Sequence, residues 1–80
     1  MKKESTELLC DCVCRSLNRY FADMNGEEPK ELYELVIGQI EKPLLEVVMD
    51  RSESNQTRAA KMLGINRNTL RKKLRHYGLN

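Results

Sequence analysis

Apolar residues recur at spacings of three and four in the first third of the chain, which is typical of a helix with one apolar stripe. The stripe consists of Leu9, Val13, Leu17, Tyr20, Phe21 and Met24. Ser5 and Thr6 are residues that cap the start of a helix, while Asn25 and Gly26 adopt the left-handed backbone that ends one. Together these signals predict a first helix that runs from this cap to about Met24.

The next apolar segment predicts a long second helix, which begins near residues 27–29 and ends at about Arg51. Residues 27–29 are Glu-Glu-Pro, and a first helical turn tolerates proline and favours acidic side chains. Pro43 lies inside this helix and cannot donate a hydrogen bond to the carbonyl of Gln39. We therefore expect the second helix to bend there.

The second helix carries more apolar residues than one stripe can hold. The surplus is concentrated in its C-terminal half, at Ile37, Ile40, Leu44, Leu45, Val47, Val48 and Met49. A pair of helices cannot cover such a surface by itself, and closed two-fold pairing of identical chains is the commonest way to bury it. Residues 1–54 are thus predicted to form the dimerisation helices of a homodimer.

Residues 55–80 have the pattern of a helix-turn-helix. Asn55 is a good N-cap for a short helix that ends at Leu63, and Gly64 provides the positive φ of a tight turn. Ile65 is placed to fill the corner between the two helices, and Asn66 to cap the second one. The chain is therefore predicted to be all-α, with four helices.

Three features fix the packing that is expected within this helix pair. Ala60 lies four residues before Gly64, where two crossing helices approach closely and a larger side chain would clash. A stripe on the last helix should be buried, and Gly78 should end that helix. The stripe consists of Leu70, Leu74 and Tyr77.

Charge is distributed unevenly along the 80 residues. Residues 55–80 hold seven Lys and Arg and no Asp or Glu, whereas residues 1–54 hold seven basic and twelve acidic residues. Clustered cations displace the counterions of a phosphate backbone, so the basic segment indicates a polyanionic partner. The alternative is a helix pair with a purely structural role and a solvated basic face, but such faces usually carry both signs of charge.

Composition excludes several other classes of protein. The chain is short enough for one domain at most, and it has no apolar run that could span a membrane. Its first residues lead into no apolar segment, so we expect no signal peptide. Three cysteines cannot all pair within one chain, which favours a reducing cytosol. The sequence holds no nucleophile–base pair and no phosphate-cradling glycine loop, so we expect neither catalysis nor a cofactor.

Cys10, Cys12 and Cys14 invite a metal or redox interpretation. At about 100° per residue Cys10 and Cys14 share the face of the first apolar stripe, and Cys12 points nearly opposite. A structural zinc site needs four converging ligands, and the only histidine, His76, lies at the other end of the chain. Buried or incidental thiols are therefore the favoured interpretation, with a metal or redox-sensing role as the alternative.

The predicted recognition helix presents a basic outer face. The residues on its faces away from the core are Arg67, Asn68, Arg71, Lys72 and Arg75. An arginine near the start of such a helix suits entry into the major groove, where it can bind O6 and N7 of guanine together. Double-stranded DNA is thus the predicted partner.

At these residues the chain resembles the Fis family of bacterial nucleoid-associated DNA-binding proteins. The resemblance rests on residues 55–60, 64–67, 69–74 and 77–80, and it extends back through residues 32–36 and 41–45 to about Leu17. It implies an obligate dimer with intertwined first and second helices. It also implies two recognition helices closer together than one DNA turn, so that DNA must bend and specificity depends largely on DNA shape.

The resemblance also assigns roles to individual residues. Asn66 and Arg67 match the pair that contacts bases, and Asn68 stands where the family typically has glycine. The positions that hold or approach the DNA backbone match Asn55, Thr57, Thr69, Arg71, Lys72 and Lys73. With Arg58 and Arg75, these residues make up the predicted DNA-binding set.

Fuller members of the family carry an N-terminal β-hairpin arm that touches site-specific DNA invertases. This chain starts close to its first helix, so we expect DNA binding and bending without recombination enhancement. The predicted function is transcription regulation and nucleoid organisation in the bacterial cytoplasm, or else control of a few promoters. The alternative from another class is an adaptor whose helical dimer docks RNA polymerase or a sensor kinase.

Overall fold

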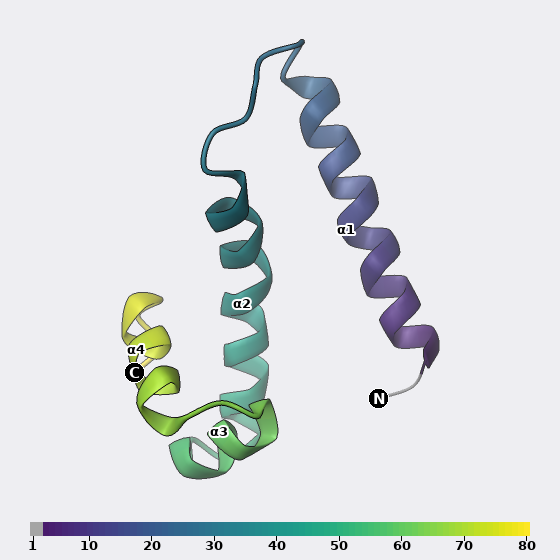
Figure 1. Cartoon of the computed structure of the whole chain (residues 1–80). Helices are drawn as coiled ribbons and strands as arrows, with labels where there is room; N and C mark the ends of the chain where they lie inside the picture. Colours follow the sequence, from purple (N-terminus) through teal and green to yellow (C-terminus); the bar gives the residue numbers. More distant parts are fainter. Residues whose placement is uncertain (1–2) are drawn as a thin grey trace. The chain divides into compact units, whose positions relative to one another are not determined.

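The computed structural model describes the backbone of residues 3–80 and the side chains of residues 8–80. The described chain consists of four helices without a strand, which confirms the predicted all-α class. The helices are α1 (Lys3–Asp23), α2 (Leu32–Arg51), α3 (Gln56–Leu63) and α4 (Arg67–His76) (Figure 1). The chain divides into two compact units, Met1–Leu32 and Tyr33–Asn80.

In the first unit, the sequence predicted the end of α1 correctly but not its start. The helix begins at Lys3, so the predicted start at Ser5 and Thr6 is wrong; lysine and glutamate are good helix formers and extend the helix past the capping residues. The end is confirmed, because Asn25 and Gly26 have φ of 53° and 85°. The predicted stripe is partly exposed in the chain.

The second helix begins later than its sequence suggests. Residues 27–29 precede α2, which starts at Leu32, so the predicted first turn at Glu-Glu-Pro is wrong. Glu31 has a φ of 53°, and a left-handed residue interrupts the helical backbone at that point. The helix then continues through Pro43 to Arg51, and the bend at Pro43 stays a prediction. None of the helices in the described part is both long and apolar enough to cross a membrane.

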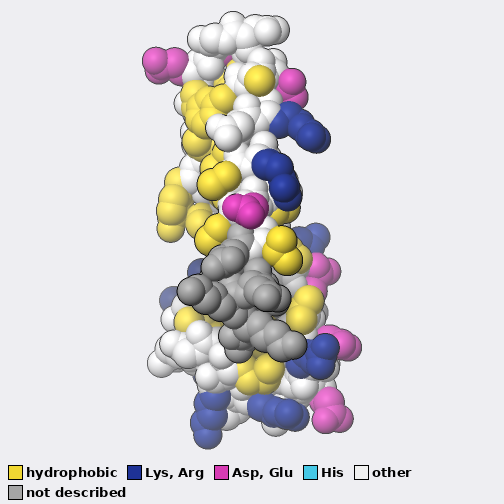
Figure 2. All heavy atoms as spheres, turned by 90° about the vertical axis from the view of Figure 1, so that its right-hand side faces the viewer, with side chains coloured by type: hydrophobic (Ala, Val, Ile, Leu, Met, Phe, Trp, Pro, Cys, Tyr) yellow, Lys and Arg dark blue, Asp and Glu magenta, His cyan; other side chains and the backbone are white. Residues whose placement is uncertain are grey.

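Two different faces of α2 are apolar, as the surplus in the sequence predicted. One face packs on the C-terminal helices: Leu45 is buried, and Val48 and Met49 lie against the same core. The other face leaves Leu44 47% and Val47 58% exposed. Apolar side chains thus remain at the surface of α2. Figure 2, which views the chain from the side where α1 lies, shows further apolar side chains on that side. We call this second face the outer stripe of α2; it consists of exposed Tyr33, Leu44 and Val47 and half-buried Val36 and Ile40.

The second unit is held together by a small core between α2, α3 and α4. Its buried residues are Leu45, Ala59, Ala60, Leu70 and Leu74. Ala60 is 4% exposed, as expected of a position at which two helices approach closely; that a larger side chain would clash there stays a prediction. Ile65 and Tyr77 pack on this core and are half-buried, as their positions in the sequence indicated.

The turn between α2 and α3 is tight and strained. The hydroxyl of buried Ser52 donates a 3.1 Å hydrogen bond to the carbonyl of Met49, and the N–H of Ser54 donates to the same carbonyl at 2.8 Å. Glu53 and Ser54 both have left-handed backbones, with φ of 55° and 64°. This conformation orients α3 against α2 at the cost of two residues that disfavour it.

Replacing Ser54 with glycine should therefore stabilise the protein. A left-handed backbone costs an L-residue about 1–2 kcal/mol, and glycine avoids this cost. Glycine also loses more conformational freedom on folding, which cancels roughly half of the benefit, so we expect a net gain of roughly 0.5–1 kcal/mol. The measurement is denaturant unfolding at one protein concentration. Ser54→Ala is the control, since it removes the hydroxyl but keeps the strain; an equal gain for both variants would contradict the explanation.

Candidate nucleic-acid interface

Local hydrogen bonds set the direction of α3. Asn55 has an extended backbone, and its Oδ1 accepts a 3.1 Å hydrogen bond from the N–H of Arg58, which confirms the predicted N-cap. At the other end Gly64 has a φ of 74°, and the N–H of Ile65 donates to the carbonyl of Ala60 at 3.0 Å. This left-handed stop turns the chain sharply into the next helix.

The recognition helix α4 is capped in the same way. The Oδ1 of Asn66 accepts a 2.7 Å hydrogen bond from the N–H of Asn68, so the predicted cap is confirmed. Arg67 is consequently the first residue of α4, at a helix end whose partial positive charge favours anions. The helix ends as predicted: Gly78 has a φ of 68°, and the N–H of Leu79 donates to the carbonyl of Leu74 at 2.8 Å.

Ten of the eleven predicted DNA-binding residues are exposed, and they lie on α4 and at the start of α3. The exposed ones are Asn55, Thr57, Arg58, Asn66, Arg67, Asn68, Thr69, Arg71, Lys72 and Arg75. Lys61, a basic residue that the prediction left out, is exposed as well. This surface can bind an extended anion, and the contact of each residue with DNA stays a prediction.

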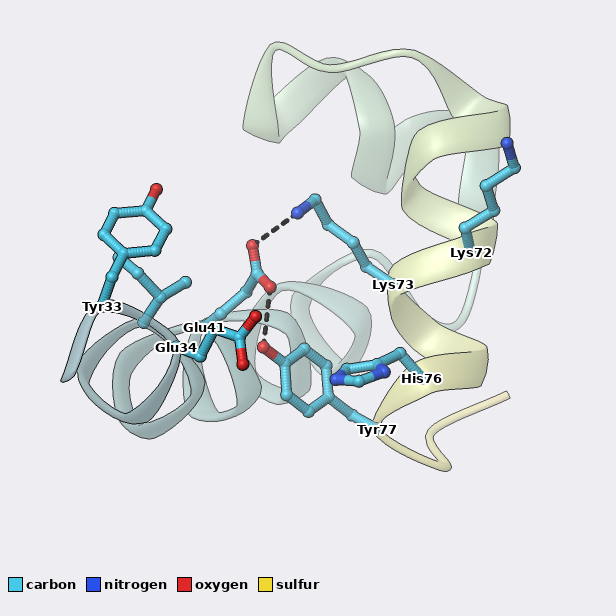
Figure 3. A pocket seen from close by; sticks show the side chains of 8 residues that line it. Tyr33, Glu34, Glu41, Lys72, Lys73, His76 and Tyr77 are labelled. Atoms are coloured by element: carbon cyan, nitrogen blue, oxygen red, sulfur yellow. Dashed lines mark hydrogen bonds and ion pairs between the residues drawn. The ribbon is translucent and has the colours of Figure 1, made fainter. Parts of the chain in front are cut away.

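Lys73 differs from the other ten, because it is half-buried. Its Nζ lies 2.8 Å from Oε2 of Glu41 on α2, and the hydroxyl of Tyr77 donates a 2.8 Å hydrogen bond to Oε1 of the same carboxylate (Figure 3). The two oxygens of Glu41 are thus bonded to α4 and to its C-cap residue. Nothing in the sequence indicated this contact, since Glu41 lies more than thirty residues from both of its partners.

This contact changes the pKa values of Glu41 and Tyr77. The hydrogen bond from Lys73 lowers the pKa of Glu41; burial of the carboxylate opposes this effect, and the bond from Tyr77 adds to it. The same contact raises the pKa of Tyr77, chiefly because its hydroxyl donates to Glu41 and ionisation would abolish that bond. At neutral pH Glu41 is therefore a carboxylate and Tyr77 a neutral phenol.

Two other features of the chain have weaker consequences for a site. Nη1 of Arg58 lies 3.7 Å from Oε1 of Glu53, but both side chains are largely exposed, so this pair does not withdraw Arg58 from other partners.

Cys10, Cys12 and Cys14 are all free and exposed, which does not fit a buried thiol. Within the described residues, no three His, Cys, Asp or Glu side chains are grouped to hold a metal ion.

Comparison with known families agrees with this geometry. A family model described as "Bacterial regulatory protein, Fis family" matches residues 36–77. The match covers more than half of the chain, including α3, α4 and most of α2. It confirms the resemblance that the sequence indicated.

Proposed function

The chain belongs to the Fis family of bacterial regulatory proteins and is a DNA-binding transcription regulator, and we propose that it acts as a homodimer that bends the DNA it binds. On this proposal it works in the bacterial cytoplasm, where it organises the nucleoid as well as regulating genes. Its action consists of binding without catalysis, and RNA polymerase is a candidate protein partner at promoters.

The observation that carries the proposal is the outer surface of α4. Arg67 begins the helix, and Arg71, Lys72 and Arg75 extend an exposed row of cations along it. No carboxylate occurs anywhere in residues 55–80 to neutralise them. Phosphate contacts of this kind position a recognition helix, while the arginine at its start reads a base edge.

A second observation supports the homodimer. The outer stripe of α2 leaves large apolar side chains exposed, with Tyr33 77% exposed and Val47 58% exposed. Contiguous apolar surface of this kind marks an interaction site, and a two-fold copy of the same stripe is its simplest cover. We call residues 55–80 of each chain its DNA-binding head. In a dimer the two heads would contact one DNA duplex at two points, which favours a bent duplex.

Binding in the presence of competitor DNA tests the proposal against the adaptor alternative. A regulator should give a shifted band and a discrete footprint on genomic fragments, with enhanced cleavage where the duplex is bent. If competitor DNA abolished binding at every site while the chain still captured polymerase stably, the adaptor would be favoured.

DNA binding should depend steeply on salt. Fourteen Lys and Arg lie in the two basic segments of a dimer, and if about six to ten of them meet phosphates, the slope of log affinity against log salt should be roughly −5 to −9. The measurement is a titration series between low and physiological salt. A slope shallower than about −2 would be too small for a backbone-binding protein and would contradict the proposed function.

A further inference from the structure

We infer that Glu41 is a positioning residue of the DNA-binding head, which fixes the recognition helix α4 on α2 and withdraws the ammonium of Lys73 from the set that meets phosphate. This inference rests on the proposed DNA binding. It assigns to an acidic residue, outside the basic segment, part of the control over how that segment meets DNA.

The geometry of the contact explains how one carboxylate can orient a helix. Oε2 of Glu41 accepts from Lys73 and Oε1 accepts from Tyr77, each at 2.8 Å. Tyr77, the C-cap residue of α4, follows Lys73 by four residues and donates its N–H to the carbonyl of Lys73 at 3.1 Å, so the two residues lie on the same side about one turn apart. Two bonds at different heights along a helix oppose both rotation about its axis and sliding along it.

The position of Lys73 shows why its charge is already used. Its side chain is 36% exposed and that of Glu41 is 21% exposed, so both groups of the pair are partly shielded from water. In Figure 3 Lys73 points to Glu41, whereas its neighbour Lys72 points away from the carboxylate. Moving Lys73 to a phosphate would leave a half-buried carboxylate without its cation, which is costly.

We call the two bonds from Glu41 to Lys73 and Tyr77 the anchor of α4. The anchor also affects Arg67, the residue proposed to read a base. Arg67 lies six residues before Lys73, which is about 9 Å along a rigid helix. A rotation of α4 at Lys73 is therefore transmitted directly to the guanidinium of Arg67. Holding the helix at Lys73 and Tyr77 leaves the outward cations free and keeps Arg67 in one orientation.

Salt slopes distinguish a phosphate contact from an anchor. Lys72→Gln should flatten the slope by about 1.8, because a dimer loses two phosphate contacts at about 0.9 each, whereas Lys73→Gln should change it by less than about 0.5. Equal flattening by the two variants would place Lys73 on a phosphate and overturn the inference.

Glu41→Gln provides the converse test, because it keeps the shape of the side chain and releases Lys73. We expect the slope to steepen by about 1.8 as two freed ammonium groups reach phosphate, and the double variant Glu41→Gln/Lys73→Gln to return to the wild-type slope. Glu46→Gln is the matched control: Glu46 is an exposed acid of α2, so its variant makes the same charge change without releasing Lys73. If the two glutamate variants behaved alike, the effect would be general electrostatics and the inference would be wrong.

Unfolding measurements test the anchor independently of DNA. Lys73→Gln and Glu41→Gln should each lower the unfolding midpoint, and the double variant should lose less than the sum of the two. If Glu41→Gln fails to fold, Tyr77→Phe still tests the anchor, since it removes one hydroxyl and should lower the midpoint with the salt slope unchanged. Additive losses, or an unchanged midpoint for Tyr77→Phe, would overturn the anchor. Failure of the wild-type chain to bind DNA would instead refute the proposed function, and the coupling in unfolding would remain.

Discussion

Leu44→Asp should yield a chain that neither dimerises nor binds DNA at concentrations where the wild-type chain does both. Leu44 is 47% exposed in the single chain, and a surface substitution there would change the stability of a monomer by only about 0.5 kcal/mol. In a two-fold dimer the same change buries two carboxylates, each at a penalty of several kcal/mol, so the dissociation constant should rise at least about 1,000-fold.

Sedimentation and mobility shifts on the same samples measure this effect. Gln39→Asp is the control, because Gln39 is an exposed polar residue of α2 outside the outer stripe and gains the same charge. Val36→Asp, at a half-buried position of the outer stripe, should resemble Leu44→Asp. A Leu44→Asp chain that stays dimeric would show that another surface forms the dimer, and a folded wild-type monomer at micromolar concentration would refute the dimer altogether.

The second large effect is expected at Arg67. Replacing Arg67 with alanine should cost about 1–3 kcal/mol for each half-site and relax the preference at one base position, because the guanidinium of an arginine can bind two guanine acceptors together. Asn66 is less suited to this role, since its Oδ1 is already bonded to the N–H of Asn68 at the start of α4. Binding to a matched site and to a singly substituted site measures both affinity and preference.

Lys72→Ala and Thr69→Ala are the matched controls for base reading. Both residues are exposed on α4, and contacts to the DNA backbone position a protein without specifying sequence, so each variant should weaken binding to both sites nearly equally. If Arg67→Ala also lowered the two affinities equally, Arg67 would be a backbone contact. Asn66 would then become the candidate for base reading.

The helix-turn-helix could be predicted from the sequence because its signals act over a few residues. Asn55 and Asn66 each cap a helix by bonding an N–H two or three residues ahead, and Gly64 supplies a backbone conformation that other residues disfavour. The stripe of Leu70 and Leu74 likewise follows from helical spacing alone. The positive charge of this segment follows from composition alone, since residues 55–80 hold no Asp or Glu.

The start of α2 was predicted less well because its signals conflict. Glu-Glu-Pro at residues 27–29 favours a first turn, yet Glu31 adopts a left-handed backbone and the helix begins at Leu32. Ser5 and Thr6 are likewise good caps that lie inside α1. A cap is only a local preference, and helix-forming neighbours or the connection to the next element can outweigh it.

The role of Lys73 was decided by tertiary structure alone. In the sequence it is one of three consecutive basic residues, and it cannot be told apart from Lys72 by composition or spacing. Folding brings Glu41 from α2 within 2.8 Å of its Nζ and leaves Lys72 exposed. The sequence by itself thus determined which segment carries the charge and how its helices turn. Only the packing of α4 on α2 decided which of those charges is already paired, because an ion pair between distant residues depends on distance in space.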